Sequence, residues 1–191
     1  MIRSLKTLLS AATLATLAAA PATAETYAID AVHSTVLGRT MHMGASRAYV
    51  RFNEIAGTVT FDEKDAAKNA LDVTVKTDSL DSANDKRDQH LKGPDFFNVK
   101  QFPTMTFKSK SVKSAGAKKY KAEGDMTLLG VTKPVSFEFE KTGEGKDRGG
   151  KAIIGGEATF TFKWSDFAGK DPMKGIGDET AVIVSIEAAA K

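Results

Sequence analysis

The 191-residue sequence contains no cysteine. This absence excludes disulfide bonds, thiolate metal ligands and a lipid anchor attached to a cysteine. Long apolar runs are also missing, since no segment after residue 24 approaches the roughly 18 uncharged apolar residues that a membrane-spanning helix needs. The chain must therefore fold by burying apolar surface, and we expect no stable membrane insertion.

The first 24 residues have the features of a secretory signal peptide. Arg3 and Lys6 form a positive N-terminal region, residues 8–20 are uncharged and apolar, and Ala22-Thr23-Ala24 has the pattern of a cleavage site. We therefore expect cleavage after Ala24, which would leave residues 25–191 as one exported domain in the periplasm. An uncleaved N-terminal membrane anchor is the alternative, which the cleavage pattern disfavours.

A large excess of charge of one sign is the third absence. The 27 Lys and Arg residues and the 24 Asp and Glu residues give a formal net charge of +3, which falls to +1 once Arg3 and Lys6 are removed. The pI of about 9.0 thus depends largely on the signal peptide. We expect no nucleic-acid partner, because such proteins carry a concentrated basic surface.

A period of two dominates the rest of the chain. Apolar and polar residues alternate over residues 55–62, 71–76, 120–128, 135–140, 157–162 and 182–186. Such strands belong to an antiparallel sheet with one face in water. About eight strands without covering helices predict an all-β fold, a closed antiparallel barrel, with a two-sheet sandwich as the alternative. An eight-stranded barrel is wide enough to hold one small ligand.

One short helix is predicted near residues 83–92. Ser82-Ala83-Asn84-Asp85 resembles a capping box, and Gly93 and Pro94 are suited to end the helix. This segment interrupts the strands, so we expect it to cover or plug the barrel.

The same segment carries a polar group next to an aromatic one. Arg87 and His90 are three residues apart and share a helix face, so Arg87, Asp88 and His90 are candidates to orient a ligand head group or to fix a lid at the barrel mouth. Phe96 and Phe97 would pack inward. The alternative is that the charges lie on an ordinary helix surface and that the phenylalanines only fill the core.

An ordered set of short motifs resembles the YceI-like family over essentially the whole mature chain. The motifs are Tyr27-Ala28-Ile29-Asp30, His33-Ser34, His42-Met43-Gly44, Phe52, Gly57, Arg87-Asp88, His90-Leu91, Phe96-Phe97, Phe102-Pro103, Phe107, Gly124-Asp125-Met126-Thr127-Leu128, Gly130-Val131-Thr132-Lys133-Pro134-Val135 and Ser165-Asp166-Phe167. The resemblance implies a periplasmic, lipocalin-like barrel that binds a long apolar lipid. The ligand would be a polyisoprenoid or an isoprenoid quinone precursor, or in some members a fatty-acid amide.

Four positions depart from the family pattern. Gly38 replaces the usual Phe, Thr40 an aliphatic residue, Val50 a Gly, and Ala168 a Gly. Loss of a Phe side chain from an inward position leaves a void. We hypothesise that the pocket is wider near Gly38, or that a strand bulge lies there.

The apolar faces of the predicted strands supply the candidate ligand-binding lining. Methionine is included because its flexible side chain adapts to a pliable ligand. The predicted lining is Met41, Met43, Val59, Phe61, Val73, Phe107, Met126, Leu128, Phe137, Phe160 and Phe162. His33 joins Arg87, Asp88, His90, Phe96 and Phe97 as a head-group or lid candidate. A dry core and purely structural hydrogen bonds are the alternatives for these two sets.

An enzyme is the rival class of function. His33 and His42 are nine residues apart and would point to opposite faces of one strand, and no zinc-binding histidine motif occurs. No G-x-S-x-G motif is present either. We therefore predict no catalytic residues, no metal and no cofactor. A stress-protective barrel without ligand stays a third possibility, and a homodimer is possible.

Overall fold

The computed structural model describes residues 24–191, so the predicted signal peptide lies almost wholly outside the described residues. The first half of the fold contains β1 (Glu25–Ile29), β2 (Thr35–His42), β3 (Ser46–Phe52), β4 (Ile55–Phe61), the short 3-10 helix η1 (Ala66–Lys68), β5 (Ala70–Lys76), η2 (Thr77–Ser79) and β6 (Leu80–Asp81). After these come α1 (Asp85–Lys92), β7 (Thr104–Gly116), β8 (Lys119–Leu128), β9 (Val131–Lys146), β10 (Ala152–Lys163), α2 (Trp164–Ala168) and β11 (Ile176–Ala190).

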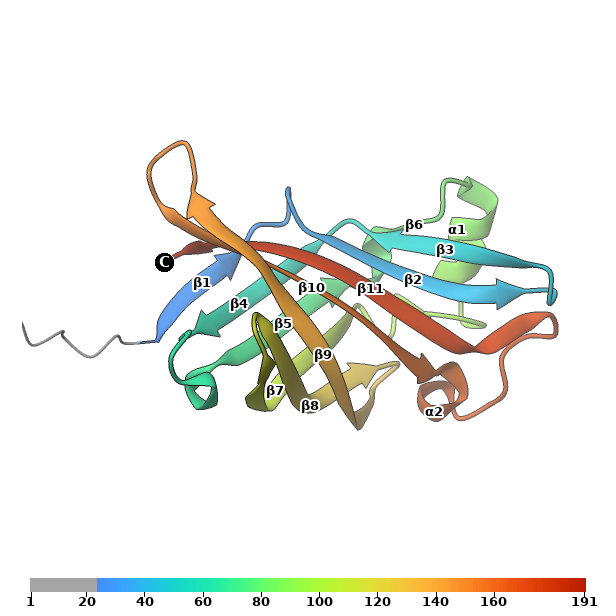
Figure 1. The fold of residues 1–191 in the computed structure, drawn as a ribbon. Helices are drawn as coiled ribbons and strands as arrows, with labels where there is room; N and C mark the ends of the chain where they lie inside the picture. Colours follow the sequence, from blue (N-terminus) through green and yellow to red (C-terminus); the bar gives the residue numbers. More distant parts are fainter. Residues whose placement is uncertain (1–23) are drawn as a thin grey trace, which may run out of the picture.

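The strands form one antiparallel sheet that closes on itself (Figure 1). Eight strands form the ring, in the order β1-β4-β5-β7-β8-β9-β10-β11, and β11 pairs with β1 to close it. Closure leaves no free strand edge within the ring. The predicted closed antiparallel barrel is confirmed, and the two-sheet alternative is wrong.

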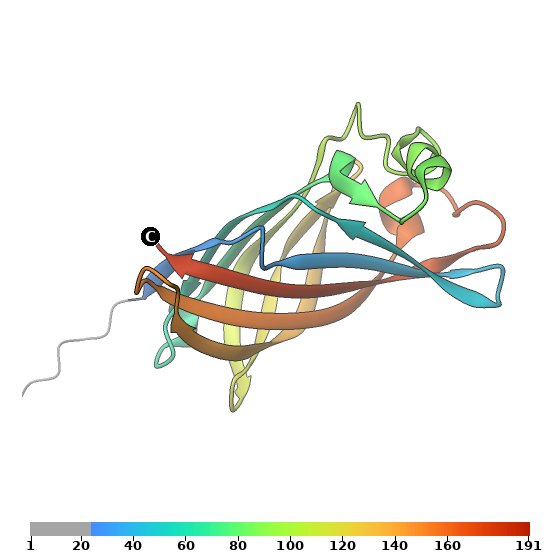
Figure 2. The same cartoon turned by 90° about the horizontal axis from the view of Figure 1, so that it is seen from above.

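Three further strands form a branch that the sequence prediction did not include. β11 is long enough to pair twice: residues 188–190 pair with β1, while residues 176–185 pair with β2. β2 then pairs with β3, and β3 pairs with β6. The β2–β3 hairpin therefore extends past the ring at one end of the barrel (Figure 2).

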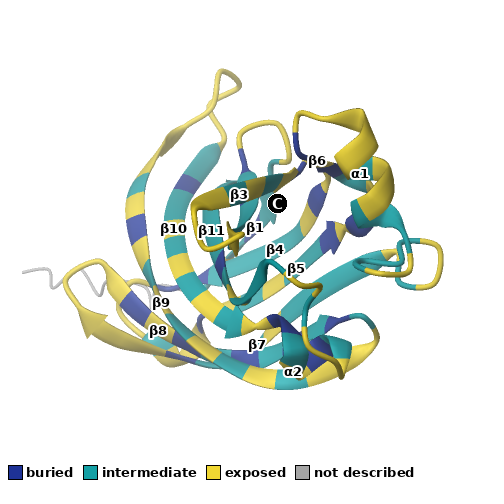
Figure 3. Cartoon of the chain, turned by 90° about the vertical axis from the view of Figure 1, so that its right-hand side faces the viewer, coloured by how far each residue is buried: buried dark blue, intermediate teal, exposed yellow. Residues whose placement is uncertain are grey.

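The two ends of the barrel differ in what they carry. The rim end bears α1, α2 and the β2–β3 turn, and the far end bears the β7–β8 and β9–β10 turns (Figure 1). Figure 3 shows the barrel from the rim end, where α1 and α2 lie beside different parts of the ring of strands. At the far end a cluster of buried residues includes Tyr27, Phe61, Tyr120, Ala122 and Ala188.

The helix α1 begins and ends near the predicted residues. The Asn84 side chain accepts a hydrogen bond from the Arg87 backbone N–H at 3.0 Å, which caps the first turn. The Gly93 N–H donates to the His90 carbonyl at 3.0 Å and ends the helix. A second helix, α2, covers five residues and was not predicted.

Candidate ligand-binding cavity

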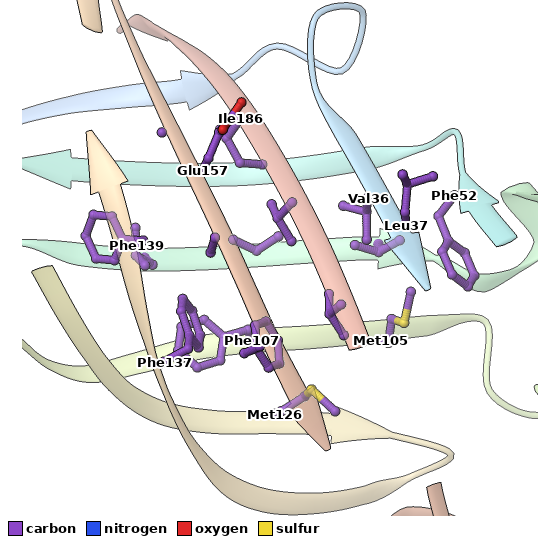
Figure 4. Close-up of a pocket in the computed structure, with 18 of the residues that line it drawn as sticks. Val36, Leu37, Phe52, Met105, Phe107, Met126, Phe137, Phe139, Glu157 and Ile186 are labelled. Carbon is purple, nitrogen blue, oxygen red and sulfur yellow. The ribbon is translucent and has the colours of Figure 1, made fainter. Parts of the chain in front are cut away.

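An apolar cavity with a volume of about 200 Å³ occupies the interior of the barrel (Figure 4). Every strand of the ring except β1 contributes to its wall, and β2 and β3 of the branch contribute as well. An apolar cavity of about 150 Å³ already binds small hydrocarbons and stays free of water. The interior is thus large enough to admit part of an apolar ligand.

Aromatic rings form one side of the wall. Phe107 and Phe137 have ring centroids 4.9 Å apart, and Phe137 stacks on Phe160 at 4.6 Å with an angle of 13° between the rings. All three point inward because each occupies the inward position of an alternating strand. Stacked rings of this kind stiffen the wall and present flat carbon surface to the interior.

Nine residues of the predicted lining set line the cavity. They are Val59, Phe61, Val73, Phe107, Met126, Leu128, Phe137, Phe160 and Phe162. Met41 and Met43 lie outside it and are 37% and 67% exposed. Val36 lines the cavity and packs in a buried cluster with Phe52. Met41 is five residues further along β2 and therefore points to the opposite side of the strand. Met43 lies in the β2–β3 turn with a positive φ of 52°.

Further lining residues were missed because the predicted set was drawn from only some of the strands. Val182, Val184 and Ile186 of β11 line the cavity, and their alternation was visible in the sequence. Trp164 comes from α2, for which the strand pattern gave no signal.

One buried charge lies at the far end of the cavity. The Lys141 ammonium is 2.6 Å from Glu144 and 5.0 Å from the centroid of the Phe61 ring, while its side chain contributes to the cavity lining. Its hydrogen bond and charge lower the pKa of the Glu144 carboxyl. Lys141 therefore already has an acidic partner at the far end of the cavity. The alternation of apolar residues in the sequence could not indicate this ion pair.

The predicted polar set on α1 fastens the helix to the barrel. The Arg87 Nε donates to the Ser82 hydroxyl at 2.8 Å, and the Asp88 carboxylate accepts from the Ser82 backbone N–H at 2.9 Å and from its hydroxyl. Ser82 is buried and directly follows β6. Arg87 and Asp88 therefore contact the residue that follows β6, and neither lines the cavity.

The aromatic half of the segment divides between surface and interior. The His90 ring packs edge-on against Phe96 at 5.1 Å and lies 3.6 Å from the Asp95 carboxylate. Phe97 lines the cavity and packs edge-on against Phe52 and Trp164, each at 5.3 Å. Of the six head-group or lid candidates, the structure places only Phe97 at the cavity wall.

This barrel and its interior match a known family of proteins. The YceI-like domain family matches residues 27–188. Protein YceI of Escherichia coli O157:H7 is 40% identical over 171 residues, which cover 88% of this chain and 89% of that protein. The chain belongs to the YceI-like family. The resemblance identified in the sequence is thereby confirmed.

Solved YceI-like structures have the same fold. The Campylobacter jejuni YceI protein is 32% identical, with a TM-score of 0.69 that covers 76% of this chain and 86% of that chain. A Saccharophagus degradans domain, described as a polyisoprenoid binding domain implicated in plant cell wall breakdown, is 12% identical with a TM-score of 0.61 over 86% of this chain and 98% of its own. The second likeness concerns the fold alone.

The four departures from the YceI-like pattern have distinct surroundings. Gly38 lines the cavity, and a Cβ added to it would meet only the Val50 carbonyl oxygen, at 3.9 Å. Its pairing with Val50 and Val182 is regular, so the bulge alternative is wrong. Thr40 donates a hydrogen bond to the Gly177 carbonyl at 2.8 Å, and Ala168 packs beside the buried Trp164 cluster.

His33 lies in the turn between β1 and β2, away from the cavity. Its Nδ1 is 2.8 Å from Asp30 and 3.5 Å from Glu187 of β11. The hydrogen bond to Asp30 raises the pKa of His33 and lowers that of Asp30. Ser34 adds to this connection, since its hydroxyl accepts from the Glu187 N–H at 3.1 Å. The cluster of Asp30, His33 and Glu187 therefore joins the turn to β11.

No helix within residues 24–191 is long and apolar enough to cross a membrane.

Proposed function

We propose that the protein binds and carries a long apolar lipid of the isoprenoid type, with the hydrocarbon chain inside the barrel. The observation that carries this proposal is the cavity itself, whose wall is built almost entirely of aliphatic and aromatic side chains. Membership of the YceI-like family supports it, as does the polyisoprenoid binding assigned to the S. degradans domain.

The energetics of such a ligand require little polar recognition. Burial of apolar surface contributes about 0.8 kcal/mol per methylene-sized group, so one five-carbon unit supplies at most roughly 4 kcal/mol. Several units together exceed the cost of association, which is about 4–15 kcal/mol. Affinity can thus come from the walls alone.

The polarity of the wall also sets the orientation of the ligand. Lys141 is held by Glu144, and the other lining residues offer few polar atoms to a head group. An uncompensated polar head group would be costly inside such a wall. The proposed arrangement therefore has the tail inside and the head group at the rim end.

Export and the absence of catalysis complete the proposal. Residues 1–24 would direct the chain to the periplasm, where a carrier shields an insoluble lipid from water. Arg87, Asp88 and His33 all have structural partners, and this supports a binding role rather than a catalytic one.

Mass spectrometry of an organic extract from natively purified protein tests this function. The wild type is expected to carry one apolar lipid, while Ala158→Phe, which places a ring in the cavity, is expected to carry several-fold less. Thr159→Phe adds the same ring to the adjacent exposed position of β10 and is the matched control.

Circular dichroism establishes that both variants are folded before the lipid content is compared. An empty wild-type extract would favour the ligand-free protective barrel. Equal lipid content in Ala158→Phe and Thr159→Phe would place the ligand outside the cavity and refute the proposal.

A further inference from the structure

The most projecting part of the rim end is formed by two segments that lie together. The β2–β3 hairpin and the loop after α2 extend beyond the ring of strands (Figures 1 and 2). The Met43 backbone N–H donates a hydrogen bond to the Gly175 carbonyl, so the hairpin tip and the loop are joined. They form one surface beside the end of the barrel where the proposed head group would lie.

Apolar side chains gather on this surface. Six large apolar side chains are exposed among the described residues, and four of them belong to the hairpin and the loop: Met41, Met43, Tyr49 and Met173. Single exposed apolar residues are normal, whereas a group on one projecting surface indicates a site of interaction. Met43 is the most exposed of these methionines, at 67%.

Arginines lie among these side chains on the outer face of the hairpin. Arg39 is directly opposite Tyr49, and Met41 is directly opposite Arg47, so these four share one face. Arg51 continues the row on β3. Val36, Val50 and Phe52 occupy the other face of the hairpin and pack in a buried cluster, so this row lies on the outer face.

These guanidinium groups lack acidic partners. Within residues 24–191 no arginine lies within 4.0 Å of a carboxylate, although nine ion pairs there involve lysine. Asp81 is directly opposite Arg51 across the β3–β6 pair but forms no such contact. The Arg39 Nε is buried without a hydrogen-bond partner. Arg47 and Arg51, which are exposed, therefore present positive charge that no carboxylate of the described residues neutralises.

We propose that this surface docks the rim end onto an anionic phospholipid bilayer. We define the rim patch as Met41, Met43, Arg47, Tyr49, Arg51 and Met173. Guanidinium groups bind phosphate with paired, charge-assisted hydrogen bonds. The methionines would enter the outer part of the bilayer, and Tyr49 suits the boundary between lipid and water.

A bilayer is favoured over a protein partner by the combination of features in the rim patch. Its projecting tip is apolar and uncharged at Met43, while the cations lie behind the tip along the strands. This arrangement matches a surface with phosphate outside and hydrocarbon beneath. A role in loading or releasing the lipid rests on the proposed function, whereas docking itself does not.

Vesicle flotation with the purified protein tests the docking. The wild type is expected to float with vesicles of phosphatidylcholine and phosphatidylglycerol at low salt, and to float much less at high salt or with phosphatidylcholine alone. Arg47→Ser/Arg51→Ser is expected to weaken binding about tenfold or more, on the usual contribution of each basic residue near an anionic membrane. Met43→Ser is expected to weaken it by a smaller factor.

Lys113→Ser/Lys119→Ser is the matched control, since it removes the same charge from exposed positions of the β7–β8 hairpin at the far end. Equal binding by this control and by Arg47→Ser/Arg51→Ser would overturn the proposal. So would equal flotation with neutral vesicles, or a dimer in light scattering that Arg47→Ser/Arg51→Ser dissociates. Analysis of lipid extracted from the same samples separates the two proposals. If the protein carries lipid but does not float with the vesicles, the docking proposal fails and the proposed lipid binding stands.

Discussion

The far end and the rim end of the barrel differ in how completely their apolar side chains are buried. At the far end Tyr27, Phe61 and Tyr120 are each less than 10% exposed, and Ala122 and Ala188 are completely buried. At the rim end the chain leaves the ring in a hairpin, two helices and a loop, and methionines face solvent. One end is thus densely packed and limits the depth of the cavity, and the other end exposes more apolar surface to solvent.

Tertiary packing explains why the rim end is the more open of the two. The arm that contains α1 is fastened by polar contacts of Arg87 and Asp88 with Ser82. Leu91, Phe97 and Val99 of the same arm pack against a buried apolar cluster, although no residue of α1 is itself fully buried. A small set of contacts can open without disturbing the barrel, since local opening depends on how much apolar surface a segment buries. Of the segment expected to close or plug the barrel, Phe97 contributes to the cavity wall.

Two tyrosines give the largest expected difference between the ends. Tyr120 is 6% exposed, stacks on Phe139 at 5.3 Å and packs edge-on against Phe61, whereas Tyr49 on the hairpin is 48% exposed. We expect Tyr120→Ala to lower the free energy of unfolding by roughly 3–5 kcal/mol, because it leaves a cavity in the far-end cluster. Tyr49→Ala should change it by no more than about 0.5 kcal/mol.

Urea unfolding of both variants measures this difference. Similar losses for the two tyrosines would mean that the hairpin contributes to the core and that the division between the ends is incorrect.

Two glycines with positive φ give a smaller difference. Gly57 in β4 has φ of 143°, and a Cβ there would overlap the Asp72 carbonyl oxygen of β5 and lie 3.0 Å from the Val73 Cα. Gly44 at the hairpin tip has φ of 67° and no heavy atom near its Cβ position. Gly57→Ala is expected to cost roughly 3 kcal/mol through strain and overlap, and Gly44→Ala about 1 kcal/mol through strain alone.

Thermal unfolding of the two alanine variants separates these causes. If Gly44→Ala is as destabilising as Gly57→Ala, then backbone strain rather than close strand packing explains both effects.

The sequence predicted the barrel well because alternation is a local property. Residues such as Phe137 and Phe160 occupy inward positions of regular strands, so their direction followed from a period of two. The same rule would have placed Met41 outside, since Gly38 faces inward on the same strand. Met41 and Met43 were included for their chemistry, and the structure puts both on the projecting hairpin.

The branch and the role of α1 could not be predicted in this way. Whether β11 pairs with β1, β2 or both depends on strands more than 100 positions away, and no local pattern records it. Arg87 and Asp88 have residue types that suit a head group equally well, and only the position of Ser82 shows their structural role. Lys141 interrupts the apolar pattern of β9. Its ion pair with Glu144, three residues later in the sequence, became apparent only in the structure.

The smallest expected effect concerns pH and the exposed turn that joins β1 to β2. The hydrogen bond that His33 donates to Asp30 raises the pKa of His33 above its ordinary value of 6.5, and the same contact lowers the pKa of Asp30 below 3.8. Because the pKa of His33 is raised in the folded state, its contribution to the free energy of unfolding is complete below about pH 6.5. That contribution is lost as the pH rises through the folded-state pKa. The contribution of Asp30 is present above about pH 4 and is lost as the pH falls through its own lowered pKa.

We therefore expect the wild type to lose a small part of its stability as the pH rises from 6 toward 8, and His33→Gln to lack that slope. Urea unfolding across this range measures the effect. His42→Gln is the matched control, because His42 lies at the rim end and forms no ion pair with any described residue. A slope that survives in His33→Gln but disappears in His42→Gln would assign the pH response to the rim end and contradict the view that His33 joins the β1–β2 turn to β11.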